Sequence, residues 1–157
     1  MKYWLLKSEP ESFSLDDLKR APRATTCWDG VRNYQARNML RDEMKRGDLA
    51  FFYHSGCELP GIVGVVEIVR EGYPDHTAFD PDDHHFDARS DPAAPRWFMV
   101  DVKFVEKFAR VLSLRELKQF ADGKLSGLQL LARGNRLSVL PVSASHWKFV
   151  MSLSKGK

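Results

Sequence analysis

The sequence predicts an α+β fold in which about five or six short strands form a small barrel or a strongly curved sheet, with helices packed around it. Three observations support this class: strand patterns outnumber helix patterns, the two do not alternate regularly, and no repeat or linker divides the chain. A doubly wound parallel sheet is therefore disfavoured. With 157 residues, 43% of them hydrophobic, residues 1–157 are expected to form one domain around a sizeable core.

The N-terminal part of the chain reads as a strand followed by a short helix. Residues 3–6 form an aromatic and aliphatic run that is typical of a strand. Ser14 and Asp17 have the spacing of a capping box, which predicts a helix from there to about Arg20. Pro22 and the two threonines after it are expected to return the chain to a loop.

A second helix is predicted over residues 33–46. Ala36, Leu40 and Met44 recur at intervals of four and form one apolar stripe. Gly47 is expected to end this helix, because glycine adopts the left-handed conformation that commonly terminates helices.

Three strands are expected to follow in the middle of the chain. Residues 49–53 and 62–69 are rich in β-branched and aromatic side chains. Residues 97–108 alternate, so Val100, Val102 and Phe104 point to one face while the residues between them point to the other.

The C-terminal part is predicted to hold a helix, a strand and a last helix. Ser113 opens a second capping-box pattern that predicts a helix to about residue 120. Residues 128–131 fit a helical turn or a strand equally well. Residues 137–142 read as the last strand, and Ser143 or Ser145 is expected to cap the final helix.

Charge is unevenly distributed along the chain although the net charge is only +3. Residues 71–92 hold seven acidic residues and one arginine, a net −6, which leaves +9 for the remainder. The remainder is basic enough to face a polyanion, although scattered solvated charge explains it equally well. Two cysteines are too few for a disulfide framework, and no apolar run has the length of a signal peptide or membrane span. We therefore expect a cytoplasmic protein without a membrane partner.

Several chemistries are disfavoured by the motifs that are missing from the sequence. No glycine-rich phosphate loop is present, which argues against a nucleotide-hydrolysing or dinucleotide-binding enzyme. The histidines and aspartates of residues 75–87 match neither a zinc nor a calcium pattern, so we expect a solvated acidic loop and no bound metal. A hydrolase that uses Cys27 or Cys57 with His54 is still an alternative, because catalytic cysteine and histidine residues need to be adjacent in the fold but not in the sequence.

Residues 28–38 are the most unusual run of the chain. They place an indole, a glycine, two guanidinium groups and three side-chain amides in one loop and helix start. Such groups can stack on a base and hydrogen-bond its edge. The alternative is that Trp28 belongs to the core and the arginines lie on the surface of a helix.

The runs Tyr3–Pro10 and Trp28–Asn38 resemble the EVE domain family. Shorter matches follow in the same order along essentially the whole chain: Gly47-Asp48, Phe52–Ser55, Gly61–Gly64, Tyr73–Asp75, Pro95–Trp97 and Asn135–Val139. The resemblance implies a PUA-like mixed barrel and a pocket that recognises a modified base, with modified cytosine in DNA first and modified adenine or RNA as alternatives. The loop His84–Asp87 departs from the family, which often has tyrosines before this aspartate.

The resemblance implies a base-binding pocket in which Trp28 is one aromatic wall and Trp97 a second. The residues assigned to this pocket are Lys7, Ser8, Glu9, Pro10, Trp28, Gly30, Val31, Arg32, Asn33, Tyr53, His54, Ser55, Trp97 and Ser138. Phosphate contacts are expected from Lys7, Arg32, Arg37, Arg133 and Arg136. No cofactor is expected, and the partner is nucleic acid. Two alternatives remain: an enzyme whose turnover depends on Cys27, Glu9 or His54, and a protein-interaction module.

Overall fold

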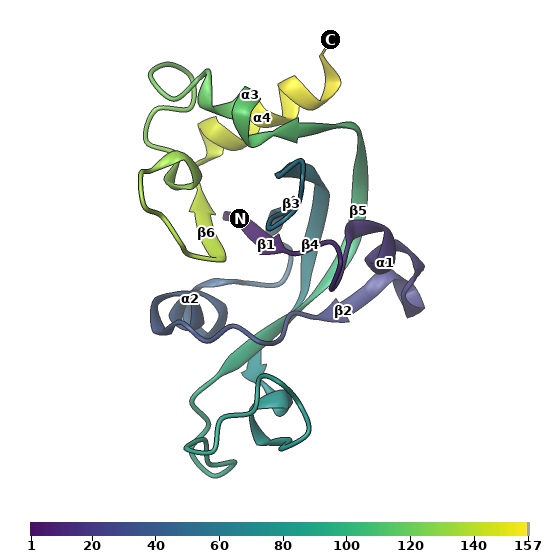
Figure 1. Cartoon of the computed structure of the whole chain (residues 1–157), viewed down its shortest axis with the longest axis vertical. Helices are drawn as coiled ribbons and strands as arrows, with labels where there is room; N and C mark the ends of the chain where they lie inside the picture. Colours follow the sequence, from purple (N-terminus) through teal and green to yellow (C-terminus); the bar gives the residue numbers. More distant parts are fainter. Residues whose placement is uncertain (157) are drawn as a thin grey trace.

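Six strands form one mixed sheet in the computed structural model, which describes residues 1–156. The strands are β1 (Tyr3–Ser8), β2 (Thr25–Cys27), β3 (Leu49–His54), β4 (Gly61–Pro74), β5 (Phe98–Ser113) and β6 (Val139–Val142), in the order β2-β5-β4-β3-β1-β6. β1 and β3 run parallel, and the other neighbours are antiparallel. The predicted fold class is confirmed, with one difference. The sheet curves strongly (Figure 1) but does not close, because its edge strands β2 and β6 are not paired with each other among the described residues.

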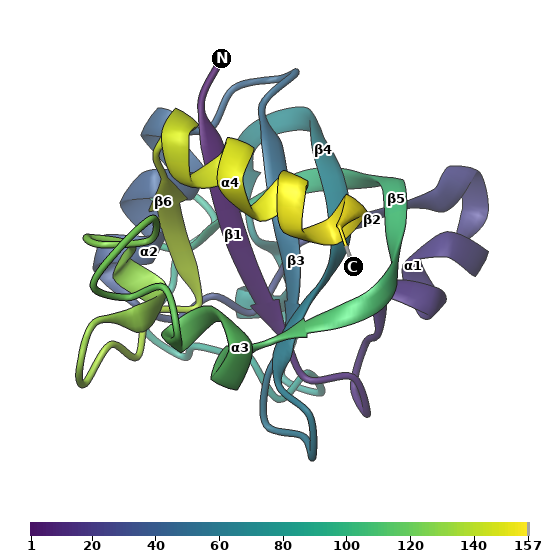
Figure 2. The same cartoon turned by 90° about the horizontal axis from the view of Figure 1, so that it is seen from above.

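Both faces of the central strands are buried, because their side chains alternate between two hydrophobic clusters. Trp4 and Leu6 of β1 belong to one cluster, whereas Leu5 belongs to the other. On β3, Phe52 joins the first cluster, and Phe51 joins the second, where its ring stacks on Trp147 with the ring centres 3.9 Å apart. Figure 2 shows the C-terminal helix α4 (Ala144–Lys155) lying across this second face of the sheet.

The two longest strands bend together and project beyond the rest of the sheet. β4 has 14 residues and β5 has 16, and their pairing shifts register at four places. Gly64 allows the closest approach, since a Cβ atom there would collide with the carbonyl oxygen of Glu106. The rim loop, residues 75–97, connects the projecting ends and begins with the short 3₁₀ helix η3 (His76–Phe79). It is the teal segment at the bottom of Figure 1.

Three of the four α-helices of residues 1–156 begin at serines that the sequence predicts as caps. Ser14 forms a complete capping box with Asp17 at the start of α1 (Leu15–Arg20). Ser113 caps α3 (Leu114–Lys118), but Glu116 binds Arg110 at 2.6 Å and does not complete the box. Ser143 caps α4. Two 3₁₀ turns complete the set, η1 (Pro22–Ala24) and η4 (Gln129–Leu131). No helix within residues 1–156 has the length and apolar character needed to cross a membrane.

Two sequence predictions are wrong in detail. The threonines expected in a loop form β2, which pairs with β5 and continues into a bond from the Trp28 N–H to the Val100 carbonyl at 2.7 Å. The helix predicted over residues 33–46 is α2 (Tyr34–Asn38) followed by the π-helical turn η2 (Met39–Glu43). It ends before Gly47 because the Asp48 carboxylate accepts the Lys45 N–H at 2.9 Å and draws the chain into a turn.

The same Asp48 carboxylate joins the N-terminal end of β1 to the turn that follows η2. It is 3% exposed and accepts hydrogen bonds from the N–H groups of Lys2 and Lys45 and from the indole of Trp4. Burial alone would raise the pKa of Asp48, but these bonds outweigh burial and hold it below its usual value. A carboxyl whose pKa falls on folding stabilises the protein above its unfolded pKa. That contribution is lost as the pH falls through the lower, folded value.

Asp48→Ala is therefore expected to lower the free energy of unfolding by about 3 kcal/mol near neutral pH, since the buried Trp4 indole and two partly buried backbone N–H groups lose their acceptor. Urea denaturation at pH 7 and at pH 3 measures this difference, which should shrink at the lower pH. Asp122→Ala, on the exposed surface, is the matched control and should change the free energy by less than about 0.5 kcal/mol. Equal stability of the two variants would contradict the prediction.

Candidate functional site

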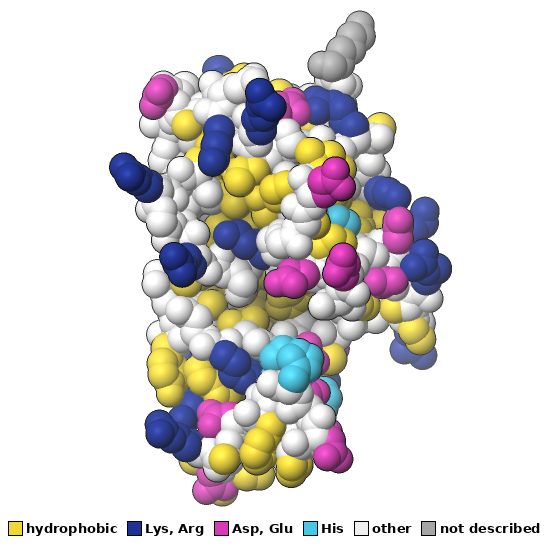
Figure 3. Space-filling view, in the orientation of Figure 1, with side chains coloured by type: hydrophobic (Ala, Val, Ile, Leu, Met, Phe, Trp, Pro, Cys, Tyr) yellow, Lys and Arg dark blue, Asp and Glu magenta, His cyan; other side chains and the backbone are white. Residues whose placement is uncertain are grey.

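A cavity of about 670 Å³ opens between the end of β1, the β2–α2 connection and the rim loop. Its lining comes from residues 7–9, 12–13, 26–32 and 83–85 and from Ser138. Figure 3 shows this hollow in the middle of the face, with histidine side chains on its lower rim and acidic side chains beside it. The volume lies within the range of about 300–1,000 Å³ that is usual for small-ligand pockets.

Trp28 supplies a rigid apolar wall of the cavity. Its side chain is 7% exposed and meets Phe52 edge to face, with the ring centres 5.4 Å apart. The bond from its backbone N–H to Val100 fixes the main chain at the same point. Val31, also nearly buried, extends this apolar lining. The indole is thus held in place by the core while one part of it faces the cavity, so both interpretations of Trp28 describe it in part.

Asp75 and Arg32 tie the two sides of the cavity together. Asp75 is fully buried and accepts hydrogen bonds from Gly30 N–H at 2.8 Å, from Arg32 at 2.9 Å, and from Thr77. Arg32 also donates two bonds to the carbonyl of His85, at 2.7 and 3.1 Å. Burial would raise the pKa of Asp75, but its hydrogen bonds outweigh burial and keep the pKa below its usual value. The guanidinium predicted to contact phosphate is therefore used to hold the rim loop against residues 30–32.

Titratable groups inside the cavity are shifted by their surroundings. Burial raises the pKa of Asp29, and the neighbouring Asp75 raises it further. Burial lowers the pKa of Lys7, whose ammonium lies 5.8 Å from the ring centre of Tyr53. Both shifts mean that water solvates these charges poorly. A ligand that offers hydrogen-bond donors to Asp29 would therefore be favoured.

The structure brings eight of the sequence-predicted pocket residues to the cavity. They are Lys7, Ser8, Glu9, Trp28, Gly30, Val31, Arg32 and Ser138. The hydroxyl of Ser8 donates to the carbonyl of Phe13 at 2.6 Å, which leaves its oxygen to act as an acceptor. The two long sequence runs thus meet in space, as the resemblance implies.

The other six predicted pocket residues do not line the cavity: Pro10, Asn33, Tyr53, His54, Ser55 and Trp97. Asn33 caps α2 by accepting the Ala36 N–H at 2.9 Å. Tyr53 is 3% exposed and belongs to the second hydrophobic cluster. His54 accepts the Leu15 N–H through Nε2 at 3.2 Å, and its burial lowers its pKa.

Trp97 belongs instead to a row of stacked side chains near the cavity. Arg37 lies 4.9 Å from the ring centre of Tyr34, Tyr34 stacks on Trp97 at 4.8 Å, and Arg32 lies 5.4 Å from Trp97. Tyr34 is 52% exposed. Of the other residues predicted to contact phosphate, Arg133 and Arg136 are exposed in the segment that leads to Ser138 and do not line the cavity. Arg37 and Tyr34 therefore form an aromatic and cationic surface outside the cavity.

Sequence reasoning missed eight residues that line the cavity: Ser12, Phe13, Thr26, Cys27, Asp29, Asp83, His84 and His85. The sequence did indicate the position of Asp29, because this residue stands between two residues that were assigned to the pocket. The sequence also pointed to the two histidines, since their loop departs from the family pattern. His85 packs on Gly30, although the two residues lie more than fifty positions apart in the sequence. No local pattern predicts a contact over that separation.

The structure does not bring Cys27 and His54 together at this cavity. Burial raises the pKa of the Cys27 thiol, and the carboxylates of Asp29 and Asp101 raise it further, which disfavours the reactive thiolate. Cys27 and Glu9 line the cavity, but His54 does not. The hydrogen bond from Leu15 occupies the ring nitrogen that a general base would use.

Comparison with known proteins shows which family has this fold. Residues 2–153 match the model of the EVE domain. The chain belongs to the EVE domain family. Thymocyte nuclear protein 1 of Rattus norvegicus is 49% identical to this EVE domain, over 99% of the chain and 74% of the relative. The resemblance drawn from the residues is confirmed.

Solved structures of EVE relatives superpose closely on this chain. A Pseudomonas syringae protein has a TM-score of 0.91 and 49% identity, covering 97% of this chain and 99% of its own. The human THYN1 protein, solved in complex with 5-methylcytosine-containing DNA, has a TM-score of 0.95 and 47% identity, covering 100% of this chain and 99% of its own. The curved mixed sheet is thus the fold of relatives from bacteria and animals.

Proposed function

We propose that this EVE domain binds DNA and recognises a modified cytosine, 5-methylcytosine foremost, as a single base inside the cavity. The observation that carries the proposal is the THYN1 complex with 5-methylcytosine-containing DNA, because that protein shares 47% identity and the whole fold with this chain. The cavity supports it independently through its size, its aromatic wall and its carboxylates.

The base would enter the cavity and stack against Trp28. Base–aromatic stacking contributes about 1–3 kcal/mol, and the buried, core-anchored indole loses no rotamer freedom when it makes this contact. A base can reach such a wall only after it leaves its own stack, which costs a few kcal/mol in a duplex. Single-stranded or mismatched DNA is therefore expected to bind better than a fully paired duplex.

Asp29 is the group best suited to distinguish cytosine from thymine. Cytosine presents an amino group where thymine presents a carbonyl oxygen, and a carboxylate accepts from the first and repels the second. Asp29 lies half-buried in the cavity lining next to Trp28. The 5-methyl group itself adds only about 0.8 kcal/mol of burial, or about fourfold in affinity. Discrimination against thymine should therefore exceed discrimination against unmodified cytosine.

Phosphates flanking the bound base would meet the basic residues around the cavity. Lys7 lines it, Arg37 lies on the neighbouring stacked surface, and Arg133 and Arg136 are exposed near Ser138. Each phosphate that is neutralised adds roughly 0.7–0.9 to the slope of log affinity against log salt. With a net charge of only +3, a shallow salt dependence is expected.

A fluorescence anisotropy panel tests the proposal directly. It compares single-stranded and duplex oligonucleotides that differ at one position (cytosine, 5-methylcytosine, thymine, adenine or N6-methyladenine), as DNA and as RNA, at two salt concentrations. We expect 5-methylcytosine DNA to bind most tightly, about fourfold above cytosine and at least tenfold above thymine. Equal affinity for every oligonucleotide, or tighter binding of a methyladenine or RNA probe, would refute the proposed specificity.

A further inference from the structure

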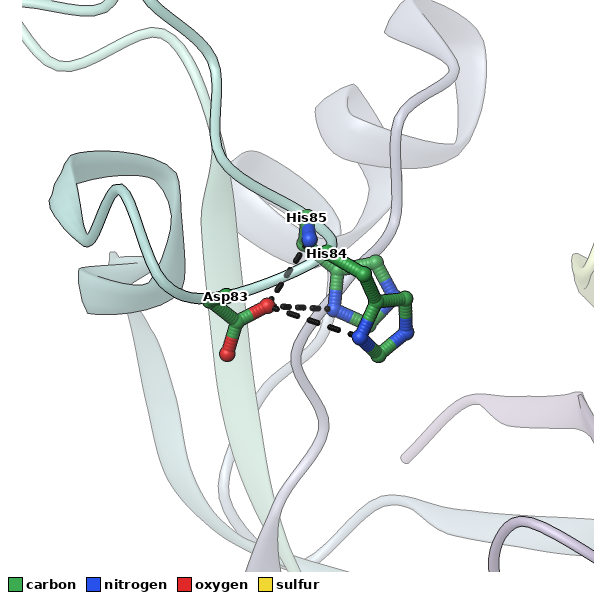
Figure 4. Close-up of side chains that lie close together, drawn as sticks. All are labelled: Asp83, His84 and His85. Carbon is green, nitrogen blue, oxygen red and sulfur yellow. Dashed lines mark hydrogen bonds and ion pairs between the residues drawn. The ribbon is translucent and has the colours of Figure 1, made fainter.

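Three consecutive residues of the rim loop gather metal-binding atoms at the edge of the cavity. Asp83, His84 and His85 each offer one ligand atom, and these atoms all lie within 4.8 Å of one another. Figure 4 shows the carboxylate of Asp83 facing both imidazole rings. No metal was expected here from the sequence, because three adjacent ligands match none of the spaced motifs of known metal sites. The loop conformation, rather than spacing, brings the three atoms together.

The two distances from the Asp83 carboxylate to the imidazole nitrogens are close to those of a tetrahedral metal site, and the two nitrogens lie within 4.8 Å of each other. His85 Nδ1 lies 3.3 Å from Asp83 Oδ1, and His84 Nδ1 lies 3.9 Å from the same oxygen. With zinc–ligand bonds of about 2.0–2.1 Å, two ligand atoms of a tetrahedron are about 3.3 Å apart. The first pair already has this separation, and the second needs to approach by only a fraction of an ångström.

The His85 ring is held in place, and its Nδ1 atom lies beside the Asp83 carboxylate without forming a hydrogen bond to it. Its ring packs so closely on Gly30 that a Cβ atom there would collide with it, and its backbone N–H donates to Asp83 Oδ1 at 2.8 Å. The Nδ1 atom is buried and makes no hydrogen bond to any of the described residues. Buried polar atoms in proteins nearly always have a partner, and a cation bound between this nitrogen and the Asp83 oxygen 3.3 Å away would supply one.

His84 supplies the ligand that can move. Its side chain is 85% exposed, and its ring centre lies 3.8 Å from that of His85. Such a side chain can adjust to an ion without disturbing the loop. Two fixed ligands and one mobile ligand are therefore in place.

We propose that Asp83, His84 and His85 form a binding site for a zinc-class divalent cation, through one carboxylate oxygen and two imidazole nitrogens. Two imidazoles with one carboxylate suit zinc and similar transition metals, whereas magnesium prefers oxygen ligands in an octahedron. All three residues also line the cavity. Three protein ligands leave a fourth coordination position on the cavity side, where water or a ligand oxygen can bind.

Isothermal titration of zinc chloride into the metal-free full chain tests the site without any DNA. We expect one zinc per chain, no comparable binding of magnesium, and at least about a tenfold loss of zinc affinity in His84→Ala and in Asp83→Asn. Neither change threatens the fold, since His84 is exposed and asparagine keeps an oxygen for the His85 N–H. His76→Ala removes an exposed histidine from the same loop and is the matched control, with unchanged affinity.

Thermal unfolding gives a second readout of the same site. Zinc should raise the melting temperature of the wild-type chain and of His76→Ala, and raise it much less in the two cluster variants, because a ligand stabilises only the folded state that binds it. Absence of saturable zinc binding to the wild-type chain, or equal affinity in the wild type, His84→Ala and Asp83→Asn, would overturn the proposal.

Discussion

Asp75→Ala is expected to lower the free energy of unfolding by about 3–5 kcal/mol and to abolish DNA binding. Asp75 is fully buried, and its loss would remove the ion-pair partner of Arg32 and the acceptor of the Gly30 and Thr77 N–H groups. Burying a charge or a donor without a partner is one of the few single changes that costs so much. Chemical denaturation and the anisotropy assay above measure the two effects.

The effect on binding follows from which segments Asp75 connects. Gly30 and Arg32 belong to one wall of the cavity, and both donate hydrogen bonds to Asp75. Arg32 also donates to the carbonyl of His85 in the opposite wall. Without Asp75 the rim loop loses its main attachment, so its amide hydrogens should exchange faster with solvent than those of β1 and β3. Hydrogen exchange therefore separates local loosening of the loop from global unfolding.

Asp16→Ala is the control for this prediction. Asp16 also pairs with a cation, Lys107 at 2.9 Å, but both side chains are about half exposed. Exposed ion pairs contribute about 0–1 kcal/mol, so this variant should keep its stability and its affinity. If Asp75→Ala were as stable as Asp16→Ala, or bound DNA with wild-type affinity, the role assigned to Asp75 would be wrong.

The comparison of Asp75 with Trp28 shows what a sequence can and cannot predict about this site. Trp28 and Gly30 were assigned to the pocket because they lie in one contiguous run, and the structure places both at the cavity. Arg32 lies in the same run, yet its partner Asp75 is 43 residues away, so its structural role is invisible locally. Contiguous parts of the cavity were predictable, and the contacts that close it were not.

The alternation of β3 explains a second group of differences. Tyr53 follows Phe52 in a run that matches the family, but successive strand residues point to opposite faces. Tyr53 therefore belongs to the cluster beneath α4, far from the wall that Trp28 and Phe52 share. His54 returns to the face of Phe52, where its ring nitrogen is used by the Leu15 N–H instead of the cavity. The pattern of the sequence predicted every strand of the sheet except β2, whereas the face on which the cavity opens depends on the curvature of the sheet.

Asp29→Asn is expected to lower the affinity for 5-methylcytosine DNA by roughly 10- to 150-fold and to remove most of the preference for cytosine over thymine. A hydrogen bond to a charged acceptor contributes about 1.5–3 kcal/mol, which corresponds to this range. The asparagine amide can still accept from the cytosine amino group, but its N–H₂ can also donate to the thymine carbonyl. The anisotropy panel with matched cytosine and thymine probes measures the change.

The same substitution should make the unbound protein more stable at neutral pH. Burial and Asp75 raise the pKa of Asp29 on folding, so its contribution favours the folded state below the unfolded pKa and is lost as the pH rises through the folded value. At neutral pH the ionised Asp29 carboxylate destabilises the folded state, and asparagine removes this destabilisation. A higher melting temperature together with weaker binding would identify Asp29 as a residue kept for recognition rather than for stability.

Glu9→Gln is the matched control for Asp29→Asn, because it makes the same chemical change at a different position of the cavity. Glu9 lines the same cavity and loses the same charge in this variant, but its side chain is exposed at the rim. Water solvates a carboxylate there, so its removal should leave the melting temperature unchanged and alter the ratio of cytosine to thymine affinity by less than about threefold. If Glu9→Gln lost the discrimination and Asp29→Asn kept it, the base edge would be read at the rim. The bound base would then lie in the opposite orientation, with its amino group toward β1.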